Sequence, residues 1–226
     1  MSLPSMIAVD GPAGAGKTTI GQAVAERLGY LFFDTGVMYR AVTLAVLRDK
    51  VSVDDESSVV ALANSLALEV LPPSVDDGRK CDVLIDGEDV SWAIFDPAVE
   101  EQVSQVSAYA GVREAMVAQQ RRIGLRGKVV MVGRDIGTVV LPEAELKIYL
   151  DASVEERARR RFAELTGRGI ETSYEQVLEA MRRRDVIDST RNVSPLKPAS
   201  DAIIIATDGL TAQQVIERIF ASVADP

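Results

Sequence analysis

The stretch GPAGAGKT, residues Gly11–Thr18, carries the strongest chemical pattern in the chain. It matches the phosphate-binding pattern G-x-x-x-x-G-K-[ST], in which glycines let backbone N–H groups converge on phosphate oxygens. Lys17 can reach the β- and γ-phosphates, and the Thr18 hydroxyl can ligate Mg²⁺. The pattern predicts a nucleoside triphosphate site, and a glycine-rich turn without a ligand is the alternative. The expected binding residues are Gly11, Pro12, Ala13, Gly14, Ala15, Gly16, Lys17, Thr18 and Thr19.

A second pattern, VVMVGRDIGTVVLP at residues 129–142, places two opposite charges inside an apolar stretch. Arg134 and Asp135 stand side by side, with Gly133 and Gly137 around them. The two charges could form an ion pair in a tight turn, or both could bind a ligand. Neighbouring side chains of an extended chain point in opposite directions, which favours the binding role.

The charges of the chain are distributed unevenly. The net charge is −9, and residues 49–101 contain fourteen acidic but only three basic residues. In contrast, residues 157–191 contain nine of the nineteen arginines and no lysine. A basic segment in an acidic chain predicts contact with a small anion rather than with a long nucleic acid. The alternative is a solvated helix with i,i+4 ion pairs, Glu155–Arg159 and Glu156–Arg160.

The arginines bear on what receives the phosphoryl group. The phosphate loop alone is compatible with hydrolysis by water, with transfer to a small acceptor and with a mechanical switch. Transfer requires two anions to be brought together, and the planar guanidinium group binds phosphate in a bidentate manner. Arg40, Arg113 and Arg134, together with an Arg-rich lid that expels water, favour transfer.

The composition excludes several functions. The chain contains no histidine, which excludes a His-based triad, a His-ligated zinc site and an imidazole base. The single cysteine, Cys81, cannot form an internal disulfide and fits a reducing cytoplasm. We expect no membrane span, because no apolar run reaches about 18 residues, and no secretory signal. No heptad pattern is visible, so a monomer is the expected state.

Short apolar runs separated by helical patterns predict an α/β fold with a parallel sheet covered on both faces. Ligands of such sheets bind at the carboxyl ends of the strands, where Asp10, Arg134 and Asp135 fall. The expected strands are Met6–Asp10, Tyr30–Asp34, Val129–Val132, Leu146–Asp151 and Ala202–Thr207, and Leu68–Leu71 and Cys81–Asp86 suggest a small antiparallel insertion. The expected helices are Thr18–Leu28, Val37–Arg48, most of Pro97–Gln120, Val154–Leu165, Tyr174–Asp185 and Ala212–Val223.

Five motifs together carry a resemblance to a known family. They are GPAGAGKT at Gly11–Thr18, FDTGVMYRA at Phe33–Ala41, GRDIGT at Gly133–Thr138, DASVEERARRR at Asp151–Arg161 and RRDVIDSTRNVSPL at Arg183–Leu196. In this order they closely resemble bacterial cytidylate kinase over nearly the whole chain. The resemblance implies a P-loop NTPase-type, five-stranded parallel sheet with an inserted small antiparallel sheet and an Arg-rich helical lid. The implied core comprises residues 1–35, 114–156 and 192–226. The implied nucleoside-monophosphate-binding domain comprises residues 36–113, with the inserted sheet at about 65–97, and the implied lid comprises residues 157–191.

The implied activity is transfer of the γ-phosphoryl group of ATP to CMP or dCMP with the help of Mg²⁺, giving ADP and CDP or dCDP. No general base is needed, because phosphoryl transfer depends mostly on positioning and charge neutralisation. The implied catalytic residues are Lys17, Arg134, Arg157, Arg161 and Arg191. The resemblance further implies that Arg40, Arg134 and Arg191 bind the acceptor phosphate, that Ser104, Arg113 and Asp135 read cytosine, and that Thr35, Arg184 and Asp188 lie near the ribose or its phosphate.

The chemistry of cytosine agrees with these assignments. Asp135 can accept from the N4 amino group while Arg113 donates to N3 or O2, and uracil would place an acceptor opposite the carboxylate. A solvated surface position is the alternative for Arg40, and ion pairs along the helix are the alternative for the lid arginines.

Two positions depart from the family pattern. The family usually has Asp directly before GRD, where this chain has Val132, so metal assistance from that strand is in doubt and Asp10 is the candidate substitute. The family often has Arg-Thr where Phe95 and Asp96 stand. Two other functions stay open: a kinase for another small acceptor, and a P-loop switch or regulatory ATPase without an acceptor.

Overall fold

The structure is a computed structural model, and it describes residues 3–224 of the chain. The described chain divides into two compact units, one formed by the residues up to Phe32 together with those from Gly124, the other by Phe33–Ile123. No helix in the described part of the chain is long and apolar enough to cross a membrane.

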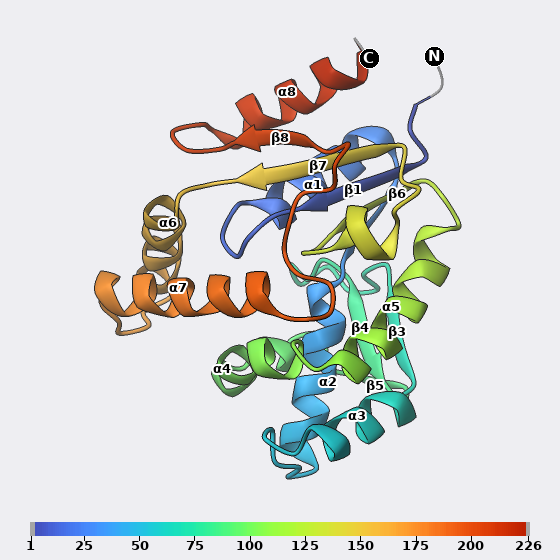
Figure 1. The fold of residues 1–226 in the computed structure, drawn as a ribbon, viewed down its shortest axis with the longest axis vertical. Coiled ribbons are helices and arrows are strands. Elements are labelled where there is room, and N and C mark those ends of the chain that lie inside the picture. Colours follow the sequence, from blue (N-terminus) through green and yellow to red (C-terminus); the bar gives the residue numbers. More distant parts are fainter. Residues whose placement is uncertain (1–2, 225–226) are drawn as a thin grey trace. The chain divides into compact units, whose positions relative to one another are not determined.

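Five strands form one sheet with the order β2-β6-β1-β7-β8, and Figure 1 labels β1, β6, β7 and β8 of this sheet. Strand β1 runs parallel to β6 and β7, and β7 runs parallel to β8. The strands are β1 (Met6–Asp10), β2 (Leu31–Asp34), β6 (Val129–Val132), β7 (Leu146–Asp151) and β8 (Ile203–Ala206). The expected parallel sheet is therefore confirmed, with strand ends that differ by at most one residue.

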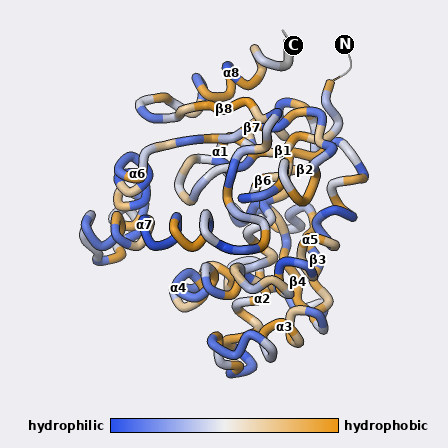
Figure 2. The backbone as a smooth tube through the Cα atoms, viewed as in Figure 1, coloured by the Kyte–Doolittle hydropathy of each residue, from blue (hydrophilic) through white to orange (hydrophobic). Residues whose placement is uncertain are grey.

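Four helices belong to the first unit: α1 (Lys17–Leu28), α6 (Val154–Gly167), α7 (Tyr174–Thr190) and α8 (Ala212–Ala224). Apolar residues of α1 and α8 pack on the strands in one core that includes Ile20, Val24, Val130 and Ile219. The strands of the sheet are accordingly largely hydrophobic, whereas α7 alternates between hydrophilic and hydrophobic residues (Figure 2). Helix α7 extends five residues past the expected end at Asp185.

The second unit contains α2 (Gly36–Arg48), α3 (Glu56–Ser65), β3 (Leu68–Leu71), β4 (Asp82–Ile85), β5 (Glu88–Asp89), a 3₁₀ turn at Ala93–Phe95, α4 (Pro97–Val106) and α5 (Ala110–Gly124). Strands β3, β4 and β5 form the expected small antiparallel sheet. Helix α3 and strand β5 were not anticipated from the sequence. Asp55 caps α3 by accepting a hydrogen bond from the Ser58 backbone N–H at 3.2 Å, which marks the helix start.

The stretch Pro97–Gln120 is mostly helical, as expected, and it is divided between two helices. Helix α4 ends at Val106, and α5 begins at Ala110. The break leaves the carbonyl group of Ser107 outside the regular helix, and this oxygen accepts a hydrogen bond from the buried Arg113 at 3.1 Å. A guanidinium group therefore satisfies a carbonyl that a continuous helix would have bonded to the backbone.

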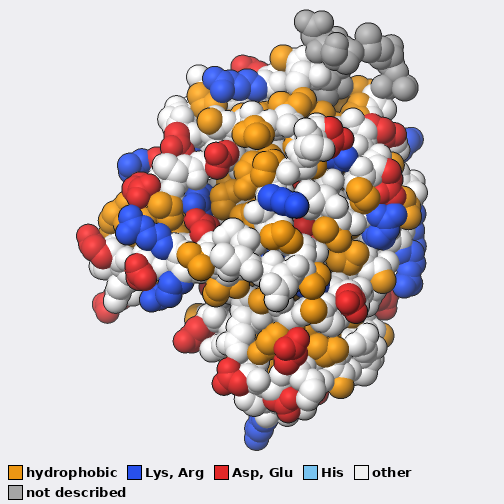
Figure 3. Space-filling model, viewed as in Figure 1, with side chains coloured by type: hydrophobic (Ala, Val, Ile, Leu, Met, Phe, Trp, Pro, Cys, Tyr) orange, Lys and Arg blue, Asp and Glu red, His pale blue; other side chains and the backbone are white. Residues whose placement is uncertain are grey.

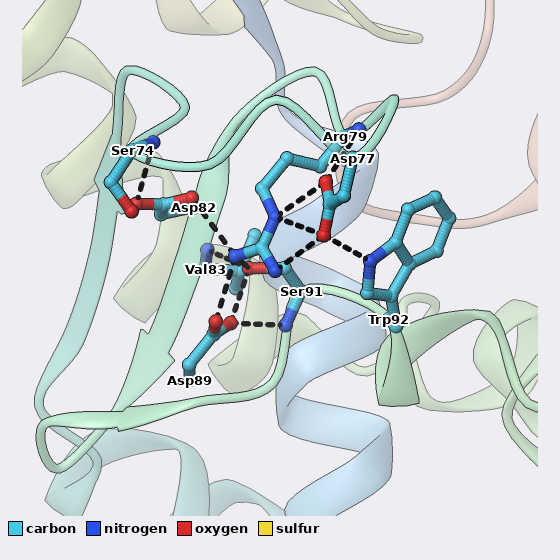
Figure 4. A network of polar contacts seen from close by, with 8 residues as sticks. All are labelled: Ser74, Asp77, Arg79, Asp82, Val83, Asp89, Ser91 and Trp92. Carbon is cyan, nitrogen blue, oxygen red and sulfur yellow. Dashed lines mark hydrogen bonds and ion pairs between the residues drawn. The ribbon is translucent and has the colours of Figure 1, made fainter.

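A polar network holds the inserted sheet together around Arg79 (Figure 4). Its guanidinium group contacts Asp77 at 2.8 Å, Asp82 at 3.1 Å and Asp89 at 2.7 Å. Trp92 joins the network by donating its indole N–H to Asp77 at 2.9 Å. These contacts join the loop before β4 to β4, to β5 and to the segment that follows β5.

Candidate functional site

The phosphate loop has the expected context between a strand and a helix. Strand β1 ends at Asp10 and α1 begins at Lys17. Gly11 and Gly16 have φ values of 147° and 93°, which residues with a Cβ rarely adopt. A Cβ on Gly11 would also lie 2.2 Å from the Leu150 carbonyl oxygen. These glycines are therefore required by the backbone path and by the close approach of β7.

Two basic side chains lie against the loop. The buried Lys17 ammonium donates to the Pro12 carbonyl at 2.7 Å. Arg157, at the start of α6, donates from Nη1 to the Ala13 carbonyl at 3.1 Å. Its guanidinium also pairs with both oxygens of Asp185 in α7, at 3.0 and 2.5 Å. An amine and a guanidinium are thus held at a loop whose conformation suits phosphate oxygens.

The other arginines of this segment have mixed surroundings. Glu156 pairs with Arg160 at 3.0 Å, as expected, and also with Arg159. The other pair named for the solvated-helix alternative, Glu155–Arg159, is not formed, since Glu155 contacts Arg182 of α7 at 3.1 Å. Basic and acidic side chains consequently alternate on the surface over α6 and α7 (Figure 3). Arg161 contacts Glu164 of the same helix at 2.7 Å on this surface. This contact agrees with the alternative of ion pairs along the helix, whereas Arg157 lies against the phosphate loop.

The GRD segment belongs to a buried charge cluster. Arg134 donates from Nε to Asp188 at 2.8 Å and from Nη1 to the Gly11 carbonyl at 3.4 Å. Arg191 lies 3.8 Å from Asp135 and 3.7 Å from Asp188, and its Nε donates to the Ser194 carbonyl at 2.6 Å. Arg134 and Asp135, the neighbouring charges of the second sequence pattern, thus each contact a charged residue from the segment around α7, Asp188 and Arg191 respectively.

Asp188 is the carboxylate at the centre of this cluster. Burial alone would raise its pKa, but the positive charges of Arg134 and Arg184, the hydrogen bond from Arg134 and the charge of Arg191 together lower it. The carboxylate therefore stays ionised among three arginines. Two of the three, Arg134 and Arg191, are in ion-pair contact with it and are among the residues expected to bind the acceptor phosphate.

Asp10 occupies a buried position at the end of β1. Its two carboxylate oxygens accept hydrogen bonds from the backbone N–H groups of Ile136 at 2.7 Å and Gly137 at 2.8 Å. Burial raises its pKa to about 6, against the lowering effect of these two bonds. Both oxygens are engaged with the backbone, so the structure gives no support to Asp10 as a substitute metal ligand.

Val132 has a structural explanation. Its side chain is fully buried and faces α1, where its Cγ1 would lie 2.4 Å from a Cβ on Gly21. This position belongs to the apolar contact between α1 and β6. In this chain it cannot supply a ligand to a metal ion.

The second unit contains the remaining expected substrate residues. Arg40 forms an ion pair with Glu100, contacts the Ile94 carbonyl at 3.5 Å and lies 5.3 Å from the centre of the Phe95 ring. The departure at Phe95 and Asp96 is thus explained: Phe95 stacks on Arg40. Asp96 caps α4 by accepting from the Ala98 N–H at 2.9 Å.

Arg113 and Ser104 approach the same turn between α4 and α5. The Arg113 guanidinium is 5.2 Å from the centre of the Tyr39 ring and donates to the Ser107 carbonyl. The Ser107 hydroxyl donates to the Ser104 carbonyl at 3.2 Å. Thr35 is buried at the start of α2, where its carbonyl accepts from the Met38 N–H at 3.2 Å.

The sequence did not indicate two polar residues that interact with the site residues of the first unit. Asp185 is one of them, since its partner Arg157 lies 28 residues away in the sequence. Tyr149, the register partner of Asp10 in β7, is half-buried. Burial and the carboxylates of Asp151, Asp10 and Asp185 raise its pKa, and Arg134 opposes them. Only the pairing of β7 with β1 could have indicated this position.

The strand order and the phosphate loop together define a P-loop nucleotide-binding protein of the α/β class. Two solved structures share the fold: a gluconokinase from Sinorhizobium meliloti, at 15% identity over 99% of this chain and 94% of that one, and a shikimate kinase from Bacteroides thetaiotaomicron, at 14% identity over 96% and 97%, both with a TM-score of 0.50.

Sequence comparison resolves the family. The profile of the cytidylate kinase family matches residues 7–225. The cytidylate kinase of Chloroflexus aggregans is 54% identical over 97% of this chain and 94% of its own length, and that of Roseiflexus castenholzii is 52% identical over 100% and 96%. This chain belongs to the cytidylate kinase family.

Proposed function

We propose that this protein transfers the γ-phosphoryl group of ATP to CMP or dCMP. The observation that carries the proposal is the pairing of the phosphate loop with the Arg134–Asp188–Arg191 cluster in one unit, in a chain of this family. The loop suits a triphosphate donor, and the cluster offers guanidinium groups to a second phosphate.

At the donor, Lys17 and the loop N–H groups bind the phosphates and offset their charge. Arg157 leaves Asp185 for the phosphates and stabilises the charge that spreads during transfer. We assign the same function to Arg161. The Thr18 hydroxyl, at the start of α1, would hold Mg²⁺, and the ion would offset the negative charge of the nucleotide phosphates.

At the acceptor, we propose that Arg134 and Arg191 bind the monophosphate, with Arg184 and Asp188 near the ribose or its phosphate. Asp135 accepts from the N4 amino group of cytosine. Within residues 33–123, we propose that Arg40 binds phosphate, that Thr35 lies near the ribose and that Ser104 and Arg113 contact the base. Arg40 must exchange Glu100 for the phosphate.

The division into a core, a monophosphate-binding domain over residues 36–113 and a lid over residues 157–191 is also a proposal. The bidentate Arg157–Asp185 contact joins α6 and α7 in this structure, which supports their assignment to one lid. We further propose that the protein acts as a cytoplasmic monomer, which light scattering and cell fractionation would test.

A substrate panel tests the function directly. ADP release is coupled to NADH oxidation with ATP and Mg²⁺ in the presence of CMP, dCMP, UMP, AMP or dTMP. We expect turnover with CMP and dCMP and far less with UMP. No turnover with CMP contradicts the proposal, equal rates with UMP and CMP contradict the assignment of Asp135, and ADP release without any acceptor indicates an ATPase.

A further inference from the structure

The three residues Gly133–Asp135 are held on both sides by bonds to the end of β1. On one side, the Gly133 N–H donates to the Val9 carbonyl at 3.0 Å. On the other side, the N–H groups of Ile136 and Gly137 donate to the Asp10 carboxylate at 2.7 and 2.8 Å. The segment that carries Arg134 and Asp135 is therefore fixed at its beginning and at its end.

Asp10 is the single side chain that makes the second of these attachments. The turn after it is a π-helical segment, Ile136–Val140, in which the N–H groups of both Val139 and Val140 donate to the Asp135 carbonyl. A π-helical turn is uncommon and often lies at a functional site. Its first two N–H groups have no partner inside the turn, so the carboxylate supplies the acceptors that a helix start lacks.

We propose that Asp10 is a positioning residue for the acceptor site: its carboxylate fixes the turn at Ile136–Gly137 and thereby sets the direction of the Arg134 and Asp135 side chains. The inference rests on the proposed function, because it assigns Arg134 and Asp135 to the acceptor. Asp10 itself contacts no substrate in this scheme. It acts through the backbone, and its contribution appears in the KM for CMP.

An ionised carboxylate is required for this attachment. Two N–H donors need two acceptor oxygens, and an amide or a protonated acid turns one of them into a donor that faces an N–H group. The groups that face Asp10 are Lys17 in α1, Asp135 beside the turn and Tyr149 in β7. Lys17 favours the ionised form and Asp135 opposes it. Burial raises the pKa of Asp10 to about 6, so the attachment weakens in mildly acidic solution.

The test compares Asp10→Asn with wild type and with the matched control Asp201→Asn, an exposed carboxylate in the same unit that pairs with Lys147. A misplaced contact group can cost up to about a hundredfold in rate, and we expect the KM for CMP to rise about tenfold in Asp10→Asn. The KM for ATP should change less than about twofold, and Asp201→Asn should match wild type in both. An equal rise in both KM values, or no rise in either, overturns the proposal.

A pH series separates this role from a general loss of structure. The ionisation of CMP itself changes with pH but is the same for both proteins. The quantity compared is therefore the KM for CMP of Asp10→Asn divided by that of wild type. The ratio of mutant to wild type should be largest at pH 7.5 and approach one at pH 5.5, where wild-type Asp10 is largely protonated. A constant ratio between these pH values contradicts the proposal.

A second variant covers the case in which Asp10→Asn does not fold. A Cβ on Gly137 would lie 3.3 Å from Asp10 Oδ2 and 3.2 Å from Lys147 Cδ, so Gly137→Ala crowds the attachment without removing the carboxylate. It should raise the KM for CMP selectively, and an unchanged KM overturns the proposal. Wild-type activity with CMP is measured first; its absence refutes the proposed function rather than the role of Asp10.

Discussion

Arg157 and Asp185 form a bidentate ion pair beside the phosphate loop, with nitrogen–oxygen distances of 3.0 and 2.5 Å. The same guanidinium donates to the Ala13 carbonyl at 3.1 Å. The contact connects α6 and α7 with the loop. Because a phosphate group offers the same pair of oxygens as a carboxylate, Arg157 can exchange Asp185 for a nucleotide phosphate without changing its geometry.

Replacing Arg157 by Lys tests this exchange. Lysine keeps the charge but cannot donate two parallel hydrogen bonds, so we expect kcat/KM for ATP to fall about tenfold or more. Steady-state kinetics with saturating CMP measures the effect. Arg168→Lys is the control, since Arg168 is exposed and lies 3.6 Å from Glu164. Similar kinetics in both variants would rule out a phosphate contact for Arg157.

Replacing Asp135 by Asn tests base selection. The amide presents a donor where cytosine N4 requires an acceptor, and an unpaired buried group costs about 1–3 kcal/mol, which corresponds to roughly five- to 150-fold. The ratio of kcat/KM for CMP to that for UMP should fall by this factor, while the KM for ATP stays close to wild type. Unchanged selectivity would refute the assignment.

Replacing Gly11 by Ala should destabilise the fold. The added Cβ would lie 2.2 Å from a backbone oxygen in β7, which cannot move as a flexible side chain does. We expect a loss of at least about 2 kcal/mol in the free energy of unfolding, measured with urea. Gly29→Ala is the control. Gly29 has a φ of 67°, and no atom lies within 4 Å of the added Cβ, so this variant measures the cost of backbone strain alone, about 1–2 kcal/mol. A smaller loss at Gly11 than at Gly29 would contradict the prediction.

Asp10 should make stability depend on pH. Its pKa is raised from 3.8 to about 6, so the folded state binds the proton more tightly than the unfolded state. The resulting stabilisation is present in full below pH 3.8 and is lost as the pH rises through 6. Between pH 5 and pH 7, wild type should lose about 1 kcal/mol relative to Asp10→Asn in urea unfolding. Parallel curves for the two proteins would show that the group does not titrate in this range.

Arg79 should control the order of the inserted sheet. Hydrogen bonds, the largest from Ser91 and the next from Arg79, lower the pKa of Asp89 to about 2. Replacing Arg79 by Gln leaves the three carboxylates of Asp77, Asp82 and Asp89 without the cation between them. Trp92 is the only tryptophan of the chain and contacts this network, so its fluorescence reports on the change. We expect an altered emission and faster hydrogen exchange over residues 72–92. Arg48→Gln, which removes an exposed pair with Glu88, is the control and should leave both signals unchanged.

Local patterns predicted most of the central fold. Buried parallel strands are short apolar runs, and a phosphate loop needs glycines at fixed spacing, so β1, β6, β7 and the loop could be recognised without neighbours. Helix α3 was missed because only Val59 and Ala63 are buried in it, which leaves no clear apolar face. The break before α5 was not anticipated, and the Ser107 carbonyl there accepts a hydrogen bond from Arg113, six residues away.

The sequence by itself determined the class of chemistry: a phosphate loop, arginines for anions and the absence of histidine are properties of residue type and spacing. Only the tertiary structure decided which charges meet. Asp185 with Arg157, Arg134 with Asp188, and Asp10 with the turn at Ile136 are separated by 28, 54 and 126 residues. Partners so far apart are selected by strand order and helix packing, which bring chain segments together regardless of their separation in sequence. The same packing turned Val132 toward α1 and made Asp10 an acceptor for backbone N–H groups.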